Sequence, residues 1–118
     1  MKRRGIRILP GGDYGFAWIK HGTNAKDLEY FVRYLGFTPM EALLATTQLG
    51  GQVMMMGNEL GMIRDGFLAD LLLVDGDPTA DIRILQQPER ILAVMKDGQF
   101  YKEPEIRSTR SRLSLTAA

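Results

Sequence analysis

The chain has 118 residues, a formal net charge of +1 and no cysteine. This length allows one ordinary domain, and the near-neutral charge argues against binding to nucleic acid or another acidic polymer. The absence of cysteine excludes disulfides and thiolate metal sites.

The start of the chain is basic, with Lys2, Arg3 and Arg4 in the first five positions. No apolar segment of signal-peptide length follows it, and no window reaches the roughly 18 apolar residues that a membrane helix needs. We therefore expect no membrane association and a cytoplasmic location.

The first predicted element is a short strand over residues 5–9, which Pro10-Gly11-Gly12 ends abruptly. Asp13 follows directly. A carboxylate just past the carboxyl end of a strand lies where α/β folds place functional groups. The alternative is that Asp13 only closes the Gly-Gly turn, and both interpretations stay open at this point.

Residues 14–23 are interpreted as a loop with large side chains rather than a linker. The loop contains the only histidine, His21, and three aromatic residues: Tyr14, Phe16 and Trp18. His21 is a candidate metal ligand, base or substrate contact. A lone histidine between Lys20 and Gly22 is more often a solvated loop residue, so this alternative also stays open.

Two helices are predicted next. Thr23 or Asn24 is expected to cap a helix that runs to about Leu35 and ends at Gly36, with one apolar stripe formed by Leu28, Phe31, Val32 and Leu35. Thr38-Pro39-Met40-Glu41 is a capping box with proline at the first helical position, and predicts a second helix to near Leu49.

Gly50-Gly51 is expected to break or bend the second helix before Val53-Met54-Met55-Met56. The methionine run is interpreted as core packing rather than as an adaptable binding surface. Because this helix is apolar over most of its surface, we expect cover on more than one side.

The organising element is expected to be a strand at Leu71–Val74, a continuous apolar run between turn residues that predicts cover on both faces. Its predicted neighbours are residues 61–64 upstream and residues 91–96 downstream. Asp97-Gly98 is a strong hairpin signal leading to residues 99–102. The nearby aspartates are interpreted as structural: Asp70, Asp75 and Asp77.

The remaining segments are less regular. Residues 82–85 form a short apolar segment, residues 86–90 a polar loop, and residues 104–118 a frayed tail without apolar periodicity. The glycine turns lack the lysine and the spacing of a phosphate loop, so a nucleotide site is not expected.

Taken in order, several segments resemble the C-terminal part of a metal-dependent amidohydrolase, in the branch that includes imidazolonepropionase-like enzymes and Xaa-Pro dipeptidases. The matching segments span about residues 5–102: Gly5 to Asp13, His21-Gly22-Thr23-Asn24, residues 36–43, residues 60–63 with Gly66, Ala69-Asp70-Leu71, Asp75-Gly76-Asp77-Pro78 and residues 94–98.

The resemblance implies an α+β segment: the last strand and helices of a (β/α)₈ amidohydrolase barrel, followed by the C-terminal strands of its small β-sandwich. Residues 1–57 are expected to supply the barrel part, residues 58–103 the sheet and residues 104–118 a flexible tail. The resemblance gives Asp13 the role of metal ligand and proton carrier for the attacking water. It places His21 and Tyr14 near the substrate.

The family's other metal ligands, mainly histidines, are expected upstream of Met1. The resemblance therefore implies a divalent metal, zinc, in the complete enzyme, no cofactor for the isolated chain, and inactivity alone. The expected partners are the missing N-terminal barrel segment and a small amide or dipeptide substrate. The alternative is a non-catalytic remnant or interaction module that forms homo-oligomers.

Overall fold

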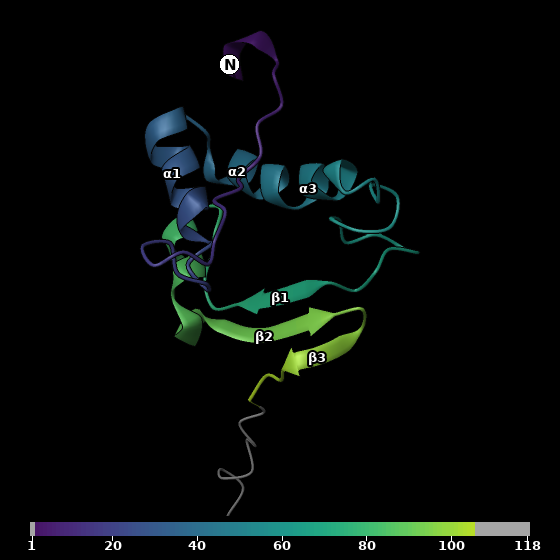
Figure 1. Ribbon diagram of the computed structural model, residues 1–118. Coiled ribbons are helices and arrows are strands. Elements are labelled where there is room, and N and C mark those ends of the chain that lie inside the picture. The colour runs from purple at the N-terminus through teal and green to yellow at the C-terminus, as the bar shows by residue number, and fades with distance from the viewer. Residues whose placement is uncertain (1, 106–118) are drawn as a thin grey trace, which may run out of the picture.

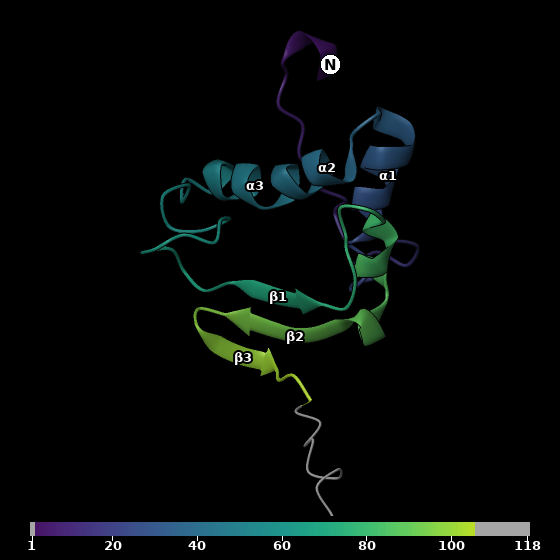
Figure 2. The same cartoon turned by 180° about the vertical axis from the view of Figure 1, so that it is seen from behind.

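The computed structural model describes residues 2–105 and shows an α+β arrangement. Three helices precede a three-stranded antiparallel sheet (Figure 1): α1 (Lys26–Leu35), α2 (Pro39–Thr46), α3 (Gln48–Val53), β1 (Leu71–Val74), β2 (Ile91–Lys96) and β3 (Gln99–Lys102). Short 3-10 helices add η1 (Lys2–Arg4), η2 (Ile82–Gln86) and η3 (Pro88–Arg90). Helices α2 and α3 run almost in line along the β1 side of the sheet, and both views place α1 at one end of this layer (Figures 1 and 2).

Helix α1 ends as predicted but does not begin as predicted. Gly36 adopts a left-handed φ of 70° and donates its N–H to the Phe31 carbonyl, as in a glycine C-cap. The N-cap position is Ala25, without a side-chain cap. The expected cap from Thr23 or Asn24 is wrong, because the Thr23 hydroxyl donates to the Lys20 carbonyl at 2.7 Å.

The capping box of α2 is confirmed. The Thr38 N–H donates to the Glu41 carboxylate at 2.7 Å, and the Glu41 N–H donates to Thr38 Oγ1 at 3.2 Å. The predicted end of this helix is wrong, since α2 stops at Thr46 and a new helix, α3, contains both glycines. The hydroxyls of Thr46 and Thr47 donate to carbonyls four residues earlier at 2.9 Å, a contact that bends helices.

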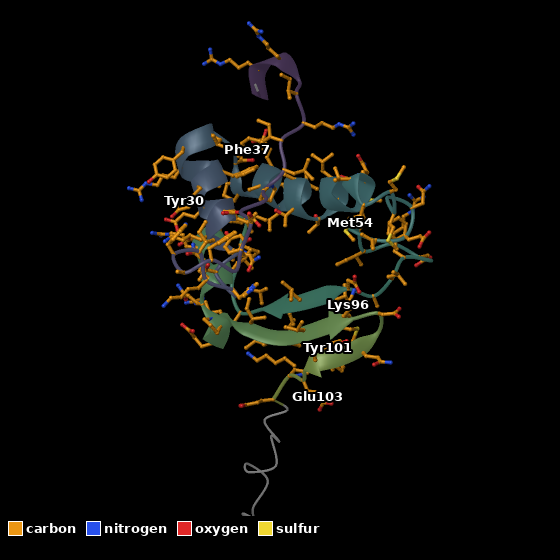
Figure 3. The ribbon with its side chains drawn as sticks, in the orientation of Figure 1. Tyr30, Phe37, Met54, Lys96, Tyr101 and Glu103 are labelled. Atoms are coloured by element: carbon orange, nitrogen blue, oxygen red, sulfur yellow. The ribbon has the colours of Figure 1, made fainter. Side chains whose placement is uncertain are left out.

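Gly51 does not break the helix but allows the backbone at Leu60 to approach it closely. A Cβ atom there would lie 2.7 Å from the Leu60 carbonyl oxygen, whereas one at Gly50 would meet nothing within 4 Å. Of the three methionines after α3, Met54 is 65% exposed, Met55 is 93% exposed and Met56 is half-buried, so the core packing expected for the run is wrong for the first two (Figure 3 shows Met54).

Two of the predicted strands are absent from the described residues. Residues 5–9 and residues 61–64 have no strand assignment. A strand requires a paired neighbour for its backbone N–H and C=O groups. Neither segment has such a neighbour here, although Ile8 still packs against the hydrophobic core. The expected last barrel strand is therefore not formed in this chain by itself.

The sheet has the order β1-β2-β3, so β1 is an edge strand and β2 is central. The expected central position of Leu71–Val74 is wrong. Leu72 pairs with Val94 in β2 on one side only, and Leu72 and Leu73 remain 58% and 51% exposed. The hairpin prediction is confirmed: Asp97 and Gly98 have φ values of 49° and 75° between β2 and β3.

Asp70 has the structural role that was expected. Its carboxylate accepts the Asp97 N–H at 2.7 Å and lies 3.6 Å from Lys96 Nζ. Asp70, the residue before β1, is thus hydrogen-bonded to the turn between β2 and β3. The predicted apolar segment at residues 82–85 lies within η2, and part of the expected polar loop forms η3.

The hydrophobic core lies between α1, α2 and η2 rather than in the sheet. Its buried members are Leu28, Phe31, Ala42, Ala45 and Ile82. Phe37, labelled in Figure 3, packs edge-on against Phe31, with 5.0 Å between the ring centroids. The Gln86 side chain donates to Glu29 at 2.7 Å and connects η2 to α1. On α1, one of the helices of this core, Asp27 accepts the hydroxyl proton of Tyr14, the residue after Asp13.

Within residues 2–105, the helices are too short or too polar for any of them to cross a membrane. Of the predicted tail, residues 104–118, the part from residue 106 onward lies outside the described residues.

Candidate functional site

Asp13 lies in the irregular segment between the glycine pair and the aromatic loop. Its backbone has a left-handed φ of 48°, and its side chain is exposed. Aspartate tolerates this conformation better than most residues, and such conformations concentrate at functional sites. The carboxylate is thus accessible to a substrate or another chain.

Tyr14 fixes the chain immediately after Asp13. Its hydroxyl donates a 2.7 Å hydrogen bond to Asp27 Oδ1 on α1. Burial and this bond to a carboxylate raise the pKa of Tyr14 to about 12. Tyr14 is therefore a neutral phenol at ordinary pH, with its proton held by Asp27.

Gly12 fixes the chain on the other side of Asp13. A Cβ atom there would lie 2.5 Å from the Tyr14 ring and 3.1 Å from Asp27 Oδ2. Only glycine allows the ring to lie so close to the backbone. Asp13 therefore lies between two residues that pack closely together beside α1.

His21 lies against the same segment, beside Gly15. Its Nε2 lies 2.9 Å from the position that a Cβ atom would occupy on Gly15, whose φ is 125°. The three residues singled out from the sequence thus belong to one local structure: Asp13 and Tyr14 are adjacent, and exposed His21 packs over the residue after Tyr14.

A tight turn projects from this structure. The Gly15 N–H donates to the Ile19 carbonyl at 2.9 Å, and the Ile19 N–H donates to the Phe16 carbonyl at 3.1 Å. The Phe16 and Trp18 rings stack with 6.3 Å between centroids, and Trp18 is 82% exposed.

A cavity of about 410 Å³ lies between this turn and α1, lined among others by Trp18, Lys20, Lys26 and Tyr30. Sequence reasoning missed Lys20, Lys26 and Tyr30. For Lys26 and Tyr30, the sequence does contain a signal: their four-residue spacing places them on one helix face. The two side chains are in contact in the structure, with Lys26 Nζ 5.7 Å from the Tyr30 ring centroid.

Among residues 2–105, no cluster of three or more histidine, aspartate or glutamate side chains is placed to hold a metal ion. Zinc sites in proteins use three or four such ligands. These residues therefore do not form a metal site on their own, and Asp13 offers one carboxylate.

The sequence matches the Amidohydrolase family over residues 1–101. The chain belongs to this family. Among curated proteins it is similar to ochratoxinase from Aspergillus niger, with 32% identity over 109 residues, which cover 88% of this chain and 21% of ochratoxinase.

Solved structures give the same result. A Xaa-Pro dipeptidase with bound methionine has 36% identity and a TM-score of 0.77, over 86% of this chain and 23% of that one. A protein described as a putative prolidase from Bifidobacterium longum has 30% identity and a TM-score of 0.79, over 89% of this chain and 26% of that one. The resemblance to a prolidase-like branch of the amidohydrolases is confirmed.

This amidohydrolase chain spans about a fifth of the length of the ochratoxinase that it matches. It is an α+β piece whose arrangement recurs in amidohydrolase structures.

Proposed function

We propose that the chain is the C-terminal segment of a metal-dependent amidohydrolase that hydrolyses C–N amide bonds in a dipeptide or a cyclic amide. The observation that carries the proposal is the 36% identity and TM-score of 0.77 to a Xaa-Pro dipeptidase over 86% of the chain. In this proposal residues 1–57 belong to the barrel and residues 58–103 to the small sandwich.

Asp13 carries the acid–base chemistry in the proposal. It takes a proton from the attacking water and returns it to the leaving nitrogen, a role that suits an accessible carboxylate on a fixed backbone. Gly12 and Tyr14 fix that backbone against α1.

His21 and Tyr14 are proposed to contact the substrate. The exposed imidazole of His21 lies close to the Asp13 loop. Tyr14 contributes its ring, because its hydroxyl proton is donated to Asp27.

The metal ligands besides Asp13 are proposed to come from the N-terminal barrel segment, since the described residues do not assemble a metal site. The isolated chain is accordingly proposed to be inactive, and the divalent ion, zinc, belongs to the complete enzyme.

A chimera tests the role of Asp13. We would replace the matching segment of the Xaa-Pro dipeptidase with this chain and measure the hydrolysis of dipeptides. We expect turnover, and Asp13→Asn should lower kcat by at least about 100-fold, the usual scale for a general acid–base residue. The matched control is Asp65→Asn, an exposed turn aspartate, which should leave turnover unchanged.

Equal turnover of the Asp13→Asn chimera and its parent would contradict the proposal. So would a folded, metal-loaded chimera without activity. Circular dichroism and metal analysis of each chimera establish those two conditions.

The second candidate function is an interaction module that forms homo-oligomers. Exposed apolar side chains favour it, including Met55 at 93%, Ile63 at 91% and Leu72 at 58%. Sedimentation distinguishes the two: a stable oligomer of the purified chain supports the module, and a monomer contradicts it.

A further inference from the structure

The cavity between the aromatic turn and α1 has the size and walls of a small-molecule site. Its volume is about 410 Å³, and small-molecule sites commonly occupy about 300–1,000 Å³. The turn supplies Trp18 and Lys20, and α1 supplies Lys26, Asp27 and Tyr30. Figure 3 shows Tyr30 on α1.

The charges around this cavity favour an anion. Two lysines, Lys20 and Lys26, line it together with one aspartate, Asp27. One oxygen of Asp27 already accepts the Tyr14 hydroxyl proton at 2.7 Å. The cations therefore outnumber the anion, and a ligand carboxylate would restore neutrality.

The rings around this cavity favour a flat apolar group. Trp18 stacks on Phe16 with an interplanar angle of 16° but is still 82% exposed. Tyr30 is 39% exposed, with Lys26 Nζ 5.7 Å from its ring centroid. An aromatic ligand gains ring contacts here while its carboxylate reaches a lysine.

We propose that this cavity binds a small molecule that carries one carboxylate and one aromatic ring. Gly12 and Tyr14, the two neighbours of Asp13, also line the cavity. The inference rests on the proposed function in one respect: it takes the ligand to be the carboxylate-bearing end of the amide substrate, held beside Asp13.

The fluorescence of the full chain tests this inference, because Trp18 is its only tryptophan. We would titrate the chain at neutral pH with phenylacetate, with its uncharged analogue phenylacetamide, and with acetate, which lacks the ring. A saturable change with phenylacetate is expected, with at least tenfold weaker binding of the other two.

Lys26→Gln is expected to weaken phenylacetate binding about tenfold and to leave phenylacetamide binding unchanged. The matched control is Lys96→Gln, an exposed lysine of β2 on the sheet (Figure 3), which should change neither. Circular dichroism shows whether each variant keeps its fold. If Lys26→Gln does not keep its fold, the titrations of the unmodified chain with the three ligands test the inference.

Equal affinity for phenylacetate and phenylacetamide would overturn the inference, as would the absence of a saturable response or an unchanged Lys26→Gln titration. Binding is measured here without turnover. If phenylacetate binds saturably but the chimera is inactive, only the proposed function is contradicted. If the chimera shows Asp13-dependent turnover but phenylacetate does not bind, only this inference is contradicted.

Discussion

The helical layer and the sheet of this chain differ in how much of their apolar surface they bury. Helices α1 and α2 bury Leu28, Phe31, Ala42 and Ala45, whereas Ala93 is the one buried residue of the three described strands. The apolar run of β1 is longer than any comparable run in α1, yet its leucines are exposed. An apolar run therefore predicts the strand itself, while its burial depends on neighbours that other parts of the protein must supply.

The largest expected effect in this comparison is from Phe31→Ala. Phe31 is 7% exposed and packs on Phe37, so its truncation should lower the free energy of unfolding by about 3–5 kcal/mol. Thermal or urea unfolding measures this loss. The matched control is Tyr34→Ala, on the same helix but 65% exposed, which should lower the free energy of unfolding much less. Similar losses from the two variants would show that the core is not where we place it.

A much smaller effect is expected from Leu72→Ala in β1. Leu72 is 58% exposed, so less than half of the about 1.5–3 kcal/mol gained by full burial is at stake. The substitution should lower the free energy of unfolding by only about 1 kcal/mol in the same assay. If Leu71–Val74 were the organising strand covered on both faces, as expected from the sequence, this substitution would unfold or aggregate the chain, and that outcome would reverse the comparison.

The last effect in this comparison appears only at high pH, in the Tyr14–Asp27 contact. The pKa of Tyr14 is raised from its ordinary value of 10.0 to about 12. A raised pKa means that the native state keeps a proton that the unfolded chain loses. The contribution of this contact to the free energy of unfolding is therefore complete below pH 10 and is lost as pH rises through 12. Ultraviolet titration should show one late tyrosine ionisation that Tyr14→Phe removes and Tyr101→Phe leaves in place. Persistence of the late step in Tyr14→Phe would contradict this assignment.

Local chemistry explains which parts of the fold were predictable. The capping box at Thr38, the C-cap at Gly36 and the hairpin turn at Asp97-Gly98 depend on interactions within a few residues, and all three are confirmed. The expected strands at residues 5–9 and 61–64 depend on distant pairing, and neither forms among the described residues.

The candidate site shows the same division. The sequence singled out Asp13 by its position after the Pro-Gly-Gly turn, and its role stays a prediction. The hydrogen bond from Tyr14 to Asp27 and the cavity between Trp18 and Tyr30 could not be recognised from the sequence, because they require the aromatic loop to fold back onto α1. Sequence periodicity gives helix faces but not such long-range contacts.

The central claim is that the Asp13 loop rests on a helical core that is more stable than the sheet. Native-state hydrogen exchange of the full chain tests it directly, because amide protection follows the free energy of local opening. We expect slower exchange for the last amides of α1, residues 31–35, than for β1, Leu71–Val74. Protection of β1 equal to or greater than that of α1 would contradict it.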